Sequence, residues 1–354
     1  MGTTFTGNQS IITEFILLGF SELPDQPFLF FIFSTIFYLT TILGNLLIIV
    51  AVVGSPGLHT PMYFFLGNLS FLEILYTSTV VPKMLASFLR KEAISLAGCL
   101  LQFFIFGSLA TTECFLLAIM AYDRYLAICY PLHYSLLMGS KHCVGLVVTA
   151  WLSGFAVDGL IVILMAQLKF CGSNHINHFY CDFMPVVRLA CSDSQVVQAT
   201  TFILSVICLT IPFSLILTSY ARILVAVLKV PTGARRRKAF STCSSHLAVV
   251  STFYGTLMVM YIAPSAVHSK LLSKVFALLY TVVTPIFNPV IYTLRNKEVH
   301  EVLKKLLCSK QYVSGTRGDS HRSGILSPNN LRTRSAGLVE QPARPAWRLR
   351  SKKT

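Results

Sequence analysis

The stretch that decides the fold reads Met120-Ala-Tyr-Asp-Arg-Tyr-Leu-Ala-Ile-Cys-Tyr-Pro-Leu-His-Tyr134. It follows an apolar run over 99–121 and sets an acid beside a base, Asp123 and Arg124, where that run should leave the lipid. Charges are costly inside a bilayer, so a paired acid and base at the end of a span indicates a function. Arg124 can be held by the neighbouring carboxylate or released toward a partner that docks from the cytoplasm, which makes the pair a two-state element. An isolated Asp-Arg pair would be interpreted as a solvated helix end, and the flanking residues argue against that interpretation.

The rest of the chain is unlike a soluble domain, because its 354 residues are 54% hydrophobic and only 12% charged. Seven apolar stretches are each long enough to cross about 30 Å of hydrocarbon. We place them at 28–53, 61–89, 99–121, 143–164, 197–228, 239–262 and 271–294. A helix satisfies its own backbone groups in lipid, whereas barrel strands would be shorter and would alternate in polarity. We therefore predict an all-α membrane protein, a seven-transmembrane helix bundle.

The distribution of basic residues predicts the orientation of this bundle. With the amino terminus outside, 22 of the 29 Lys and Arg residues fall on the cytoplasmic side, and the first 27 residues contain none. The positive-inside rule therefore makes residues 1–27 an extracellular segment, with a glycosylation sequon at Asn8, and places the carboxyl terminus in the cytoplasm. We expect a multi-pass plasma-membrane protein whose transmembrane domain, 28–294, targets the chain without a cleaved signal peptide.

Two further segments follow the last span. Residues 295–309 alternate basic and apolar side chains, which predicts a short amphipathic eighth helix on the membrane surface, with membrane lipid as a partner. Residues 310–354 are rich in arginine and poor in apolar side chains, which predicts a disordered, basic cytoplasmic tail. This tail is either a regulatory extension or the product of a mis-joined reading frame. Because it is tethered to a membrane, we expect no nucleic-acid partner.

Among the polar side chains inside the predicted spans, four form a possible cation site: Asn45, Glu73, Glu113 and Asn288. Asp158 in the fourth span is a further buried acid to which the sequence assigns no role. A carboxyl group within a span is costly unless it is partnered. The four residues of the possible cation site could share a sodium ion or protons, or a protonated glutamate could hydrogen-bond to neighbouring helices. The sequence leaves both alternatives open, and apart from such a sodium ion we expect no cofactor and no metal.

Cysteines mark the outer side of the bundle. Cys99 opens the third span, and the loop after the fourth span holds Cys171, Cys181 and Cys191. Thiols in an oxidising compartment favour disulfides, although four cysteines allow three pairings and the sequence alone does not choose among them. The same loop carries His175 and His178, which could bind zinc or copper together with a cysteine and a carboxylate.

Four motifs carry a resemblance to a known family. Pro61-Met-Tyr-Phe-Phe-Leu-Gly-Asn-Leu-Ser70 resembles the second-span signature of vertebrate olfactory receptors, and residues 120–134 resemble the third-span end of rhodopsin-like G-protein-coupled receptors. Lys238-Ala-Phe-Ser-Thr-Cys-Ser-Ser-His-Leu247 is similar to the olfactory sixth-span signature, and Pro285-Ile-Phe-Asn-Pro-Val-Ile-Tyr292 is similar to the superfamily's seventh-span switch. The resemblance covers residues 10–309 and points to the tetrapod-type (class II) branch. The departures are Glu73, where the family usually has aspartate, Gly67, where it usually has serine, and the tail.

The resemblance implies an odorant receptor, not an enzyme. Such a receptor binds small, mostly apolar volatile molecules and activates a heterotrimeric stimulatory G protein, which raises cyclic AMP. It implies the disulfides Cys99–Cys181 and Cys171–Cys191, and a Cys181 in a disulfide cannot be a thiolate ligand, so loop packing is favoured over a metal site. The residues implied in G-protein coupling and switching are Asp123, Arg124, Tyr125, Tyr220, His246, Asn288, Pro289 and Tyr292.

Residues of an odorant cavity can be projected from helical spacing, because positions one turn apart share a face. The candidates lie in the outer halves of four spans: Phe106, Gly107, Ala110, Thr111, Ser205, Cys208, Tyr254, Leu257, Tyr261, Leu278 and Thr281. An apolar wall with a few hydroxyls suits a small neutral ligand, and the lack of a basic residue at this depth disfavours acids. Each of these residues taken singly could instead serve helix packing.

Two alternatives to odorant sensing remain at this point. A receptor of the same fold could serve a non-odorant ligand outside the olfactory epithelium, which its expression pattern would reveal. An ion-coupled transporter could use Glu73 and Glu113, but the sequence shows no inverted internal repeat of the kind transporters have.

Overall fold

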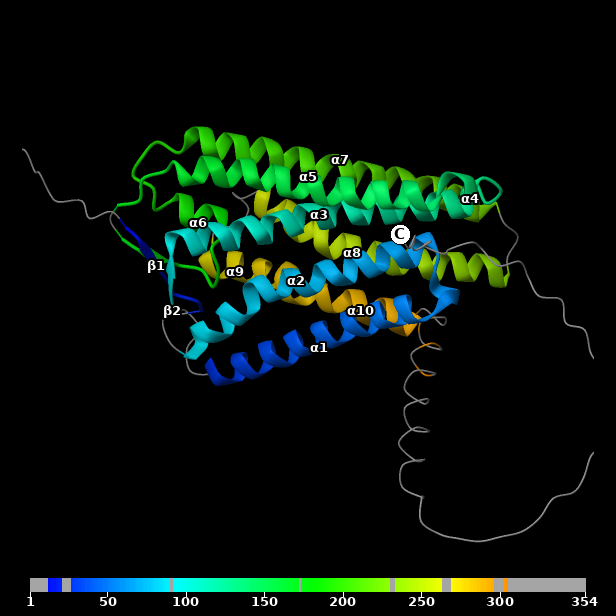
Figure 1. The fold of residues 1–354 in the computed structure, drawn as a ribbon, viewed down its shortest axis with the longest axis horizontal. Helices are drawn as coiled ribbons and strands as arrows, with labels where there is room; N and C mark the ends of the chain where they lie inside the picture. The colour runs from blue at the N-terminus through cyan, green and yellow to red at the C-terminus, as the bar shows by residue number, and fades with distance from the viewer. Residues whose placement is uncertain are drawn as a thin grey trace, which may run out of the picture. The chain divides into compact units, whose positions relative to one another are not determined.

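The computed structural model describes residues 12–20, 27–89, 92–171, 173–229, 233–262, 269–295, 299, 302 and 304. Long helices run side by side as a bundle within the unit that ends at Leu307 (Figure 1). These helices are α1 (Pro27–Gly54), α2 (Pro61–Leu89), α3 (Leu96–Cys129), α5 (Ser140–Ala166), α7 (Gln195–Leu228) and α8 (Ala234–Tyr261). The seventh path through the bundle is formed by α9 (Lys270–Leu278), the π-helical η3 (Leu279–Val283) and α10 (Thr284–Arg295). The short helices are η1 (Pro56–Leu58), α4 (Tyr134–Leu137) and α6 (Phe183–Val187).

The predicted seven-helix bundle is confirmed, with shifts at the helix ends. Helix α2 begins at Pro61, as the preference of proline for the first turn leads one to expect. Helix α3 begins at Leu96 because the side chain of Ser95 caps it, accepting a hydrogen bond from the backbone N–H of Gly98 at 3.1 Å. The same helix continues to Cys129, well beyond the predicted end at 121, so Asp123 and Arg124 lie within its last turns.

Hydropathy separates the helices into two groups. Five of the described helices, α1, α2, α3, α5 and α7, have the length and composition of a membrane span, while the other two paths contain shorter apolar stretches at His246–Tyr261 and Leu271–Phe287. Large apolar side chains on the outward faces of the helices are exposed. Examples are Leu43, Leu152 and Ile203, with exposed fractions of 60%, 66% and 56%. Apolar surfaces of this extent mark contact with a membrane.

The seventh path departs from a regular α-helix. The π-helical hydrogen bonds of Leu279–Val283 join residues five apart, so side chains beyond them are rotated from the positions that a 3.6-residue period predicts. Further along, Pro289 of α10 lies against Gly44 of α1, where an added Cβ would stand 2.8 Å from the Cβ of the proline. A glycine at position 44 thus allows these two helices to meet closely.

A small sheet that the sequence did not predict covers the end of the bundle at which the loop after α5 lies, which is termed the outer end. Strand β1 (Glu14–Leu17) pairs antiparallel with β2 (Glu92–Ser95) and parallel with β3 (His175–Ile176), in the order β2-β1-β3. Phe15 of β1 is fully buried and its ring meets that of Phe170 edge to face at 5.4 Å. The pairing joins three segments far apart in the sequence, and none of them shows a strand pattern long enough to recognise alone.

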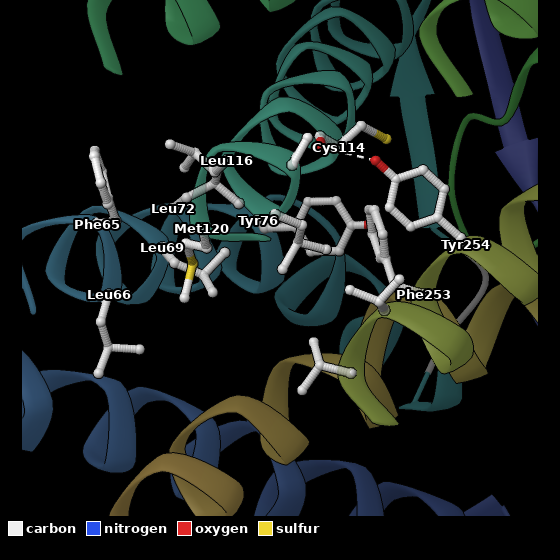
Figure 2. Close-up of a cluster of buried hydrophobic side chains, with 14 of the residues drawn as sticks. Phe65, Leu66, Leu69, Leu72, Tyr76, Cys114, Leu116, Met120, Phe253 and Tyr254 are labelled. Atoms are coloured by element: carbon white, nitrogen blue, oxygen red, sulfur yellow. Dashed lines mark hydrogen bonds between the residues drawn. The ribbon is translucent and has the colours of Figure 1, made fainter. Parts of the chain in front are cut away.

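Two hydrophobic clusters fill the bundle. The outer cluster joins Phe15, Cys99 and the loop after α5, and the inner cluster joins α2, α3, α7, α8 and η3. Figure 2 shows part of the inner cluster, where Tyr76 and Phe253 face each other and the Tyr254 hydroxyl donates to the Cys114 carbonyl at 2.8 Å. The most buried aromatic side chains therefore tie α8 to α2 and α3.

Several predicted features lie outside the described residues. They are the glycosylation site Asn8, the side chains of Asn288 and Tyr292, the tail at 310–354, and most of the amphipathic helix predicted at 295–309.

Candidate functional site

The loop between α5 and α7 is fixed over the outer end of the bundle by two disulfides. Cys99 is joined to Cys181, with their Cα atoms 5.4 Å apart, and Cys171 is joined to Cys191, as the resemblance implies. Gln102 of α3 strengthens this attachment, because its side-chain oxygen accepts the backbone N–H of Cys181 at 3.0 Å. The loop is therefore held on α3 by a covalent bond and a neighbouring hydrogen bond.

Beneath and beside this loop the structure contains two cavities. The outer cavity has a volume of about 420 Å³, and its wall includes His175, His178, Asp182 and Arg188. The inner cavity has a volume of about 70 Å³ and lies between α3, α5, α7 and α8, with a mostly apolar wall. Both cavities are bordered by the same four residues: Phe183, Thr201, Ser205 and Tyr261.

Eight of the eleven projected cavity residues line the inner cavity. They come from α3, α7 and α8 and are Phe106, Gly107, Ala110, Thr111, Ser205, Cys208, Leu257 and Tyr261. Helical spacing located them because α3, α7 and α8 are regular over these turns.

The other three projected residues do not line either described cavity, and their placement corrects the projection. Tyr254 is fully buried and its hydroxyl donates to the Cys114 carbonyl of α3, which turns the ring into the core. Thr281 is buried and donates to the Ala277 carbonyl at 2.7 Å, while Leu278 packs against the inner cluster. Thr281 lies within the π-helical stretch, which changes the face that this part of the chain presents.

Some lining residues were missed by the sequence analysis. Asp158 of α5 reaches the inner cavity, where it accepts a hydrogen bond from the Thr111 hydroxyl at 2.9 Å. Its signal was a carboxylate inside an apolar span, but no partner for it could be read from the sequence. Phe183 was missed because it belongs to the short loop helix α6, whose position depends on the disulfides rather than on any periodic pattern.

Polar side chains link the loop to α8 and η3 at the boundary of the two cavities. Asp182 caps α6 by accepting the backbone N–H of Phe183 at 2.8 Å, and it also accepts the Tyr261 hydroxyl at 3.1 Å. Burial raises the pKa of Asp182 above its ordinary value, and these hydrogen bonds oppose the rise. The hydroxyls of Tyr180 and Tyr280 also hydrogen-bond to each other.

His178 faces the outer cavity without a hydrogen bond to either ring nitrogen among the described residues. Its ring packs against Phe179 and Tyr180, with centroid separations of 4.6 Å. Burial, followed by the charge of Lys274, lowers the pKa of His178 to about 3, so the ring is neutral at physiological pH. Within the described part of the chain no group of three His, Cys, Asp or Glu side chains could hold a metal ion.

At the opposite end of the bundle, Asp123 and Arg124 are not paired with each other, which is the released state of the two that the sequence allows. Asp123 is buried and accepts the hydroxyl of Tyr134 at 2.7 Å, whereas Arg124 contacts the sulfur of Met62 on α2. Burial and the nearby carboxylate raise the pKa of Tyr134, which keeps it a hydrogen-bond donor. The aspartate thus anchors the loop after α3, and the arginine is free of that carboxylate.

The remaining switch candidates lie on α3, α7, α8 and α10. Tyr220 and His246 stack with ring centroids 5.6 Å apart and join α7 to α8. The Tyr125 ring packs against Tyr130 at 5.6 Å. Pro289 is the residue that approaches Gly44.

Of the four cation-site candidates, the structure brings two together. Glu73 and Glu113 are buried in the core and their carboxyl groups hydrogen-bond to each other. Such a bond requires a proton between the two groups, since two carboxylates would repel. Asn45 is buried too, but its amide nitrogen donates to the Thr41 carbonyl of its own helix at 3.1 Å.

A bundle of membrane-length helices, with a disulfide-anchored loop above an apolar cavity and an arginine at the opposite end, defines a multi-pass membrane receptor. The sequence profile of the olfactory receptor family matches residues 33–310. The chain is 74% identical to human olfactory receptor 11A1 over 306 residues, which cover 86% of this chain and 97% of that receptor. It is 51% identical to human olfactory receptor 11H4 over 84% of this chain and 92% of that one, and 46% identical to rat olfactory receptor 1468 over 86% and 97%.

The chain therefore belongs to the olfactory receptor family. It is an odorant receptor that signals through a G protein from the plasma membrane, and it is not an enzyme.

Proposed function

We propose that odorants bind in the inner cavity, reach it through the outer cavity, and activate a stimulatory G protein that raises cyclic AMP. The observation that carries this proposal is the shared border of Phe183, Thr201, Ser205 and Tyr261, which makes the two cavities neighbours. Aromatic and aliphatic side chains dominate the inner wall, whereas the outer wall holds charged and amide groups. A mostly apolar molecule buries more of its surface against apolar groups in the inner cavity.

The size of the inner cavity implies that a ligand has to open it. Binding sites for small molecules are typically about 300–1,000 Å³, and this cavity measures about 70 Å³. An odorant therefore binds an arrangement in which α3, α5, α7 and α8 stand further apart. A ligand that fits this expanded arrangement better than the present one shifts the receptor toward it.

We further propose that the amino terminus is extracellular and the carboxyl terminus is cytoplasmic. This orientation places both disulfides in an oxidising environment and Arg124 where a G protein docks. The assignment to the class II branch rests on the second- and sixth-span signatures and remains part of this proposal. So do the coupling roles of Arg124, Tyr220 and His246.

The Glu73–Glu113 pair supports a second, smaller proposal about the resting receptor. The shared proton between these carboxyl groups removes one negative charge but leaves Oε1 of Glu113 without a hydrogen bond among the described residues, and a sodium ion could take its place. If sodium binds, the basal signal of the unmodified receptor should change with sodium concentration and that of Glu113→Gln should not. Equal sodium dependence in both would remove the ion from the proposal and leave the proton.

A graded filling of the inner cavity tests the main proposal. In cells expressing the full chain, responses to an odorant panel should fall stepwise through Ala110→Val, Ala110→Leu and Ala110→Phe, measured as cyclic AMP at equal surface level. Ala156→Phe is the control, because Ala156 is an exposed alanine on the outer face of α5. A response that survives Ala110→Phe unchanged would show that ligands bind elsewhere.

A further inference from the structure

Asp158 is a buried carboxyl group that the receptor mechanism above does not use. It lies on α5 with an exposed fraction of 5% and borders the inner cavity. Among the described residues it receives one hydrogen bond, from the Thr111 hydroxyl at 2.9 Å, and it makes no salt bridge. A carboxylate has room for about four hydrogen bonds, so this group has accepting capacity to spare.

Space for this carboxyl group exists because position 107 of α3 is a glycine, which has no side chain. A Cβ added at Gly107 would stand 2.2 Å from Oδ1 of Asp158 and 2.9 Å from its Cγ. Any residue other than glycine would therefore displace the carboxyl group. The glycine and the aspartate together form a niche in which an oxygen atom, rather than a methyl group, lies on the cavity wall.

A second polar group of the same cavity also has hydrogen-bonding capacity to spare. The hydroxyl of Thr201 on α7 is buried and makes no hydrogen bond among the described residues. A buried polar group without a partner costs free energy. Both groups lie in a wall that is otherwise largely apolar, with Phe103, Ile161 and Leu209 among its members. A ligand that supplies hydrogen bonds here gains affinity that an apolar molecule of equal size does not.

We propose that Asp158 selects the ligand class: the inner cavity takes small apolar molecules that carry one O–H or N–H donor, namely alcohols and amines. The proposal rests on the inner cavity being the odorant site. An ionised Asp158 only accepts hydrogen bonds, so a ketone, ester or ether of the same skeleton, which has only acceptor oxygens, makes none with it, and a carboxylate ligand adds repulsion. The Asp158 carboxyl group touches the ligand, with Thr111 holding its other oxygen.

The test compares three probes with one ring and one functional group each: cyclohexanol, cyclohexylamine and cyclohexanone. A ligand that binds only the folded protein raises its Tm, so thermal unfolding of the purified full chain reports binding without signalling. The alcohol or the amine should raise Tm at concentrations at least about tenfold lower than the ketone, the ratio that one well-formed hydrogen bond gives. Equal effects of all three probes, or no effect of any, would overturn the proposal.

Substitution of the carboxyl group gives the sharper result. In Asp158→Asn the side-chain amide can donate a hydrogen bond to a carbonyl. The affinity for the ketone should therefore rise relative to that for the alcohol, and the affinity for the amine should fall most. A variant that was merely misfolded would bind none of the three probes. Asp193→Asn makes the same chemical change at an exposed loop position outside both cavities. It should keep the order of probe affinities that the unmodified receptor has. An unchanged order in Asp158→Asn would refute the role of Asp158.

The failure of this inference differs from the failure of the proposed site. If the Ala110 series abolishes odorant responses while ketones act as well as alcohols, the cavity is the odorant site and the donor selection is wrong. If the Ala110 series has no effect and the Tm shifts are the same in Asp158→Asn, both proposals are wrong.

Discussion

Replacing Gly154 with alanine should push α3 and α5 apart and destabilise the receptor. A Cβ at this position would stand 2.3 Å from the Thr112 hydroxyl and 2.5 Å from the Ser108 carbonyl of α3. The hydroxyl already donates to that same carbonyl at 2.7 Å, and a backbone carbonyl cannot rotate away. Overpacking of this kind costs about 1–3 kcal/mol. Alanine also stabilises a helix by about 1 kcal/mol relative to glycine, so the net loss of stability is at most about 2 kcal/mol.

Gly145 on the same helix provides a matched control. It has open space around it, so Gly145→Ala adds the same methyl group without a clash and should stabilise the receptor by up to about 1 kcal/mol. The two variants then differ by the overpacking cost of about 1–3 kcal/mol, and at about 2–4 °C per kcal/mol their Tm values differ by roughly 2–12 °C. The assay is thermal unfolding of the purified full chain in one detergent. A Tm of Gly154→Ala equal to or above that of Gly145→Ala would refute the close approach of α3 and α5 at this point.

Three further predictions follow from the described contacts. Arg124→Ala should abolish the odorant-dependent rise in cyclic AMP at unchanged surface level, which surface labelling checks. Tyr254→Phe removes the hydrogen bond to Cys114, so it should lower stability by about 1 kcal/mol and raise the basal cyclic AMP signal. The folded-state pKa of His178, about 3, lies below its ordinary 6.5, so the unfolded chain binds more protons between these values and stability falls with acidity. Lowering the pH from 7.5 to 5 should cost about 2 kcal/mol, and His178→Phe should remove that loss from the Tm profile.

The sequence was sufficient for the elements that lipid imposes. A span needs a long apolar run whatever its neighbours are, so α2 was predicted with the ends that the structure has, and α1, α5 and α7 within a few residues. Regular helical geometry then placed Gly107, Ala110 and Thr111 on the cavity wall. Local rules are reliable where the helix is regular and its surroundings are uniform.

The failures have the opposite cause, because they depend on contacts between distant segments. The π-helical turn that contains Tyr280 directs Thr281 away from the projected face, and no residue pattern in the sequence indicates this turn. Strand β1 exists because β2 and β3 lie beside it, and four residues alone carry too little pattern to predict a strand. Asp158 was visible as an unusual charge, but its meaning depends on Gly107, a residue 51 positions away that lies across the helix contact.

The arrangement of α8 explains how opening of the cavity could reach the G-protein side. Leu257 lines the inner cavity, and Tyr254, one turn before it, donates to the Cys114 carbonyl of α3. If odorants bind in this cavity, as proposed, one larger than the present cavity has to displace the Leu257 turn from α3, and the same displacement would stretch the Tyr254 bond. Nearer the inner end of α8, His246 stacks on Tyr220, so a rigid movement of the helix changes the contact between α7 and α8 there. The Tyr254 bond then opposes activation, because it contributes stability to the closed arrangement and not to the expanded one. A ligand overcomes it only through affinity for the expanded cavity, which is why tight binding to the closed one would activate nothing.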